Sequence, residues 1–125
     1  MNKLTCVVAA LALSSATAMA ECIKPDQPQL PDGATASMED MLAGQKSVKT
    51  FQSSNVEYMK CLEDTFKAAE AKVKEGADGT KEAVESAQKT YTEAVEAYNA
   101  AVSSEEAVAG QFNTEIREYK AANPG

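Results

Sequence analysis

The chain has no histidine and only three cysteines among its 125 residues. Without imidazole, a serine or cysteine nucleophile loses its usual base, and most zinc sites lose a common ligand. A glycine-rich phosphate loop is also missing, because Gly76 and Gly79 are better explained as a turn. Carboxylate pairs occur, but on helices they form solvated faces, and two helices make no glycosidase-type cleft. The sequence therefore predicts a protein that is not an enzyme and has no catalytic, cofactor-binding or metal-binding residues.

Long apolar runs are absent too, since crossing a bilayer takes roughly 20 residues. The apolar stretch at residues 4–13 is shorter, follows Lys3 and precedes an A-x-A motif, which is typical of a secretory signal peptide. We expect residues 1–20 to be removed by cleavage between Ala20 and Glu21. The mature chain is then predicted to be periplasmic or secreted, with no membrane span.

Basic charge is scarce: 12 Lys and Arg stand against 19 Asp and Glu. Nucleic acid and anionic lipid surfaces are therefore not expected as partners. Between Lys89 and Arg117 the chain has acidic residues but no basic ones. This stretch is predicted to be a solvated outer face, with a surface for a basic partner or a divalent cation as the alternative. Its acidic residues are Glu93, Glu96, Glu105, Glu106 and Glu115.

Removal of the signal peptide takes Cys6 with it and leaves Cys22 and Cys61. In an exported protein, two cysteines indicate one disulfide. A redox-active or metal-binding pair is the alternative, but such sites commonly use C-x-x-C spacing, which this pair lacks. We therefore expect a structural disulfide between Cys22 and Cys61.

Apolar residues recur at steps of three and four, which predicts two long helices. The first is expected over residues 37–75, beginning at a capping box on Ser37, and the second over residues 80–121. A turn at residues 76–79 joins them. Two helices of similar length with a short connection predict an all-α fold, an antiparallel, coiled-coil-like hairpin domain over residues 37–121.

In the second helix, the side chains expected to face the first one follow this spacing. They are Val84, Gln88, Tyr91, Val95, Tyr98, Val102, Glu105, Ala109, Phe112, Ile116 and Tyr119. If the turn sets the register, Gln52 meets Glu105 and Asn55 meets Val102 in a polar middle layer. Such a layer is predicted to fix the register. The alternatives are a functional polar pocket, or a break at residues 103–110 that makes a third helix.

The segment at residues 21–36, called the strap below, has to stay extended if the two cysteines are bonded. As polyproline II it reaches about 43 Å, against about 36 Å of helix to be covered. Prolines at every third position favour that conformation. They are Pro25, Pro28 and Pro31. We expect the strap to lie along a lane of small residues on the first helix, between Phe51 and Tyr58. The lane consists of Ala36, Ala43, Ser47, Thr50 and Ser54.

Three local patterns together resemble a known group of proteins. They are C-x-x-P-x-x-P-x-x-P-D-G from Cys22, MLAGQKSV from Met41, and YMKCL from Tyr58. The chain from Cys22 to about Glu63 resembles small secreted, periplasmic proteobacterial helical proteins of uncharacterised function. These have a Cys/Pro-rich N-terminal segment and a second Cys in the first helix. The resemblance implies the same cysteine pairing and a periplasmic location, and it brings no catalytic residues.

For function, the sequence favours a structural or protein-interaction module that presents a helical face to another protein or to itself. The alternative is a chaperone-like binder of unfolded envelope proteins, suggested by three methionines, because methionine surfaces adapt to many ligands. These are Met38, Met41 and Met59. A thiol oxidoreductase is the third hypothesis and requires reactive cysteines.

Overall fold

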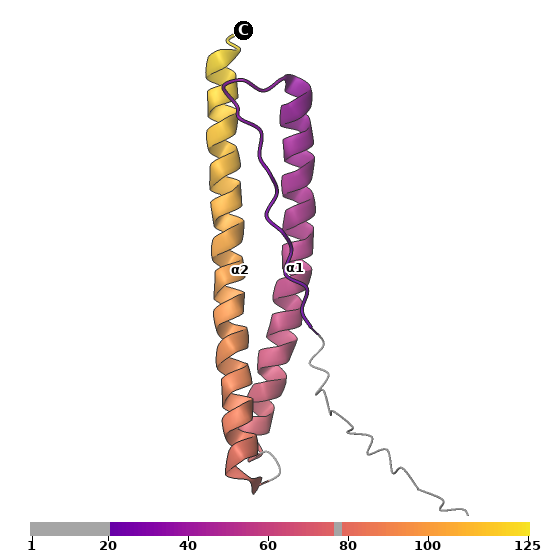
Figure 1. The fold of residues 1–125 in the computed structure, drawn as a ribbon, viewed down its shortest axis with the longest axis vertical. Helices are drawn as coiled ribbons and strands as arrows, with labels where there is room; N and C mark the ends of the chain where they lie inside the picture. Colours follow the sequence, from indigo (N-terminus) through magenta and orange to yellow (C-terminus); the bar gives the residue numbers. More distant parts are fainter. Residues whose placement is uncertain (1–20, 77–78) are drawn as a thin grey trace, which may run out of the picture.

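The computed structural model describes residues 21–76 and 79–125. They form two long antiparallel helices, α1 (Met38–Lys74) and α2 (Lys81–Ala122), and the strap runs back beside them (Figure 1). The predicted all-α hairpin with an extended N-terminal strap is thus confirmed. The expected signal peptide, its cleavage site after Ala20, and turn residues 77–78 lie outside the described residues.

Both helices begin at capping residues. The Ser37 side chain accepts the N–H of Asp40, whose carboxylate accepts the N–H of Ser37 in return, which completes the predicted capping box. Thr80 caps α2 by accepting the N–H of Ala83. After α1, Gly76 and Gly79 both take φ of 73°, a left-handed conformation that glycine adopts without steric cost. The helices therefore start and stop within one residue of the predicted positions.

The main core lies in the half of the rod that the strap covers. Large apolar side chains from both helices meet there and are almost fully buried. They are Met41, Val48, Phe51, Val108 and Phe112. Leu30 and Ala36 of the strap pack against this cluster, so the strap adds a third layer to what would be a two-helix core. Burying one large side chain of this kind contributes about 1.5–3 kcal/mol.

The half near the turn is packed differently. Leu62 and Ala69 of α1 are buried there. The ring of Phe66 sits edge-on to Tyr91 and Tyr98, with centroids 6.1 and 5.9 Å apart. Each such aromatic pair adds about 0.5–1.5 kcal/mol beyond burial. This half has fewer buried side chains, and edge-to-face contacts between aromatic rings stabilise it.

Five of the α2 residues predicted to face α1 are each one position later in the sequence than the residues that the structure buries. The buried positions are Ala87, Ala94, Ala101, Val108 and Glu115, spaced by seven. The predicted column one residue later is half-buried or exposed instead. It consists of Gln88, Val95, Val102, Ala109 and Ile116. Small alanines allow two helices to approach closely, so close backbone packing outweighed the larger apolar side chains.

The break considered at residues 103–110 is not formed, because α2 is continuous from Lys81 to Ala122. Gly110 lies within it and is exposed. Glycine costs a helix about 1 kcal/mol relative to alanine. Val108 and Phe112 on either side are buried in the main core, and their packing holds the helix together across the glycine.

The strap leaves α1 and crosses to α2 rather than lying on the predicted lane. From Cys22 it runs between the helices (Figure 1), and the Gln27 side-chain amide donates to Ser104 of α2 over 2.7 Å. Four of the five members of that lane stay exposed. They are Ala43, Ser47, Thr50 and Ser54. The prediction that the strap lies on α1 alone is therefore wrong. Leu30 of the strap packs against the core between the helices, and this contact places the strap between α1 and α2.

Two glycines make this crossing possible by close approach. A Cβ on Gly33 would lie 1.8 Å from the carbonyl oxygen of Glu115 and 2.9 Å from the amide nitrogen of Tyr119. A Cβ on Gly44 would lie 2.7 Å from the Pro31 ring. The strap turn thus touches the backbone of α2, and the proline before it presses on the backbone of α1.

Substitution of Gly33 by alanine should therefore move the strap off α2. We expect Gly33→Ala to destabilise the fold by about 1–3 kcal/mol, the usual cost of overpacking, in chemical unfolding. Gly110→Ala is the matched control, because a Cβ there meets no atom within 4 Å. That control should stabilise the protein by about 1 kcal/mol. Equal effects at both glycines would contradict the close approach.

Candidate functional site

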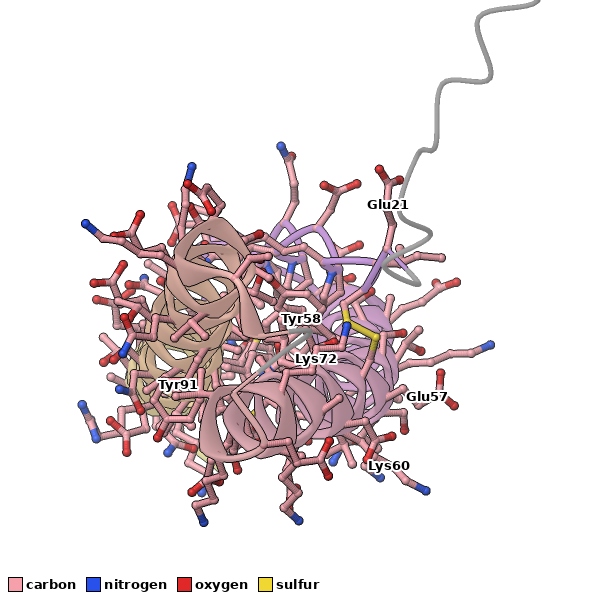
Figure 2. All side chains as sticks on the ribbon, turned by 90° about the horizontal axis from the view of Figure 1, so that it is seen from below. Glu21, Glu57, Tyr58, Lys60, Lys72 and Tyr91 are labelled. Carbon is pink, nitrogen blue, oxygen red and sulfur yellow. A yellow bond between two sulfur atoms is a disulfide. The ribbon has the colours of Figure 1, made fainter. Side chains whose placement is uncertain are left out.

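The disulfide between Cys22 and Cys61 fixes the start of the strap to the middle of α1. Their Cα atoms are 5.6 Å apart and 39 residues apart in sequence. Seen along the rod from its turn end, the disulfide lies beside α1, and Glu21 leads away from it (Figure 2). The predicted pairing is present, so the alternative of a metal-binding pair does not fit this arrangement.

The other end of the strap is held by a buried carboxylate. Glu115 of α2 is 9% exposed. Its Oε2 accepts the N–H of Gly33 over 2.7 Å, and its Oε1 accepts the Gln111 amide over 2.9 Å. Hydrogen bonds to the charged form, first that from Gly33 and then that from Gln111, hold the pKa of Glu115 below its ordinary value. Glu115 thus fastens the strap turn to α2.

This carboxylate makes the strap sensitive to acid. Because the pKa of Glu115 is lower in the fold than in the unfolded chain, its contribution to stability is fully present above the ordinary glutamate value of about 4.3. The contribution is lost as the pH falls through the lowered pKa. We expect the free-energy gap between wild type and Glu115→Gln to shrink on acidification from pH 7. A gap that stays constant in unfolding curves would contradict this.

An acidic cluster that the sequence did not predict lies at the same place. Carboxylate oxygens of Asp32, Glu115 and Glu118 lie within 4.8 Å of one another. Asp32 of the strap is 83 residues before Glu115 and 86 before Glu118, so no local motif indicates the group. Glu115 is already engaged by Gly33 and Gln111. The cluster is best explained as the chemistry that holds the strap turn.

The polar middle layer is present and bonded. Asn55 is 2% exposed, and its side-chain nitrogen donates to the carbonyl of Ala101 over 3.0 Å and to Glu105 Oε2 over 3.3 Å. Its partner is Glu105 and the backbone of Ala101, where Val102 was expected. A buried amide with these partners penalises slipped registers, which supports its predicted role over that of a polar pocket.

The same contacts correct the prediction for the acidic run. Glu105 and Glu115 turn inward to hydrogen bonds, whereas Glu93, Glu96 and Glu106 are exposed. Only part of this run is therefore a solvated face. Glu105 had been predicted both at the helix interface and in the solvated run, whereas Glu115 had been predicted as surface only, because periodicity alone does not reveal a bonded carboxylate.

An open groove of about 940 Å³ runs between the strap and α1. Its apolar walls come from Ile23, Pro25 and Pro28 of the strap and from Phe51 and Tyr58 of α1. The predicted lane of serines and threonine lines its floor. Charged side chains at its rim are Glu21, Asp26, Glu57 and Lys46, an acidic majority.

A second surface lies on the opposite side of the rod. Cys61 of α1 and Ser104 of α2 mark the side of the strap, because both are bonded to it. At about 100° per residue, Val56 lies about 140° around α1 from Cys61. Val102 lies about 200° around α2 from Ser104. The buried columns separate these residues from the strap. We call this side the open face. It consists of Met38, Leu42, Val56 and Met59 on α1 and Val95, Val102, Ala109 and Ile116 on α2.

The apolar side chains of the open face are accessible on α1. Leu42 is 58% exposed, Met38 57% and Val56 55%. The four α2 residues are half-buried and follow one another at steps of seven. The spacing of these four α2 residues predicted that they face α1. The one-residue shift of the buried α2 column turns them toward the open face instead.

Together these features define a class: a disulfide-bonded two-helix rod with one strapped and one open face. None of the helices in residues 21–76 and 79–125 has the apolar length needed for a bilayer crossing. No family model, curated protein or solved structure matches the chain. A disulfide in such a helical chain is compatible with an extracellular location.

Proposed function

We propose that this protein is a non-enzymatic periplasmic interaction module that docks another protein through its open face. The observation that supports the proposal is the exposure of Leu42 and Val56, aliphatic residues above one-half exposed on the side that the strap leaves uncovered. Exposed large apolar side chains that share one face with polar residues, as Leu42 and Val56 do with Lys49 between them, are typical of contact surfaces. The disulfide and strap make the rod rigid enough to present that surface.

Site-specific photo-crosslinking in the native host tests this proposal. A photoreactive phenylalanine in place of Val56 or Val102 is expected to form protein adducts. The same residue at Thr50 or Ser103, which are exposed elsewhere on the same helices, should form few. Equal or absent crosslinking at all four positions would remove the open face as a docking surface.

The alternative function is a chaperone-like binder of unfolded envelope proteins. The groove beside the strap favours it, because apolar walls with an acidic rim suit an extended basic segment. The methionines give it less support, since Met41 is buried in the core while Met38 is exposed. Suppression of aggregation of a model client at equimolar ratio is expected under this alternative, and its absence would exclude it.

A further inference from the structure

We propose that the open face is occupied by a second copy of this chain, forming a two-fold dimer in which α1 of each copy lies on α2 of the other. This inference rests on the proposed function and names the partner of the same surface. With the strap on the outer side of each copy, four helices would enclose the two open faces. The result is a four-helix bundle in which every neighbouring pair is antiparallel.

The register of the hairpin determines which residues would meet. Gly44 lies against Phe112, and Asn55 bonds Ala101, so residues at one height have numbers that sum to 156. A two-fold axis along the rod keeps these heights between copies. Leu42 then comes level with the neighbourhood of Ile116 in the second copy, and Val56 with that of Val102.

Charge on the same face fits this arrangement. Lys49 is exposed midway between Leu42 and Val56 in one column of α1. By the same register it comes level with Glu106 of the second copy, which is also exposed. The two-fold axis repeats the pair, so each dimer has two complementary contacts.

The reverse orientation, with turns at opposite ends, fits less well. If α1 packed on α1 about Val56, the exposed Leu42 would come level with Glu70 of the second copy. That pairing would cover an aliphatic side chain with a charged one. In the parallel orientation Leu42 comes level with the uncharged Thr114, two residues from Ile116, so the aliphatic side chain is not set against a charge.

The size of the open face is also adequate. By the same register, Val95 of α2 is level with Cys61 of α1. The open face therefore extends about 35 Å from Met38 to that level, at about 1.5 Å per residue, and two helices side by side are about 20 Å wide. This corresponds to about 700 Å² on each copy, close to the roughly 800 Å² per partner of a standard specific interface. On the strapped side the strap covers the helices, and the surface that remains is the groove between the strap and α1.

Sedimentation of the purified oxidised protein over a range of concentrations tests the inference. We expect a dimer at micromolar concentration. Val56→Lys and Val102→Lys should each weaken it by about tenfold or more, because each buries a charge in an apolar contact. Thr50→Lys and Ser103→Lys, at exposed positions off the open face, are the matched controls and should leave it unchanged. Helicity and melting of the monomer report whether a variant still folds.

The charge pair tests the orientation separately. Lys49→Glu should weaken the dimer by like-charge repulsion with Glu106, and Lys49→Glu combined with Glu106→Lys should restore it. A photoreactive residue in place of Leu42 should crosslink to the peptide containing Ile116 of another copy. Failure of rescue together with a crosslink near Glu70 would overturn the parallel arrangement.

Two outcomes separate this inference from the proposed function. A strict monomer whose open-face positions still crosslink to a different protein in cells would overturn the second copy as partner and leave the docking role intact. A strict monomer with no crosslink above the Thr50 and Ser103 controls would overturn both.

Discussion

Replacing both Cys22 and Cys61 by serine should lower the free energy of unfolding by about 4 kcal/mol, the chain-entropy value for closing a loop of this length. The melting temperature should fall by roughly 15 °C or more, since domains of this size lose several degrees per kcal/mol. The effect is large because two helices have a narrow core. Thermal unfolding followed by circular dichroism measures it.

A reducing agent provides the control for this prediction. Reduction should lower the melting temperature of wild type to that of the double-serine variant and leave the variant itself unchanged. The freed strap should also become cleavable after Asp26, which is exposed in the strap, by a protease that cuts after acidic residues, while the helices retain their ellipticity. Equal melting of oxidised and reduced protein would contradict a structural role for the bond.

Truncation of Phe51 to alanine should cost about 3–5 kcal/mol, the usual range for a buried phenylalanine. Phe51 is 4% exposed and belongs to the main core, and its other edge lines the groove beside the strap. Its removal therefore loosens contacts between the helices and leaves a cavity under the strap. Chemical unfolding gives the magnitude.

Ile23→Ala is the comparison for Phe51→Ala, because Ile23 lines the same groove but is 84% exposed. A change at an exposed apolar residue should stay within about 0.5 kcal/mol. If both substitutions cost the same, the strap and not the helical core would carry the stability of this half.

Local chemistry made the helices predictable. Ser37 with Asp40, Thr80, and the glycines at 76 and 79 act on residues a few positions away, and their hydrogen bonds and φ angles follow from sequence. The disulfide was predictable as well, because the two cysteines left after the predicted signal peptide have one simple pairing. These features fix the hairpin and the reach of the strap.

The candidate surfaces depended on contacts between distant segments, and there the sequence misled. Apolar size pointed to Val95 and Val102 as inward residues, whereas close packing selected Ala94 and Ala101. Gly33 gave no sign that it approaches α2, since its role arises only when the strap crosses the helices. The α2 side of the open face arises from that one-residue shift, which periodicity does not resolve.

The bond between Cys22 and Cys61 also determines how tension would travel through the molecule. Force applied at the two ends of the described chain passes from Cys22 directly into the middle of α1, so the intervening loop bears no load. With 39 residues bypassed, about 130 Å of contour length would stay unreleased at roughly 3.4 Å per residue. Stretching would therefore peel α2 and the turn-proximal part of α1, while the looped portion remained inextensible.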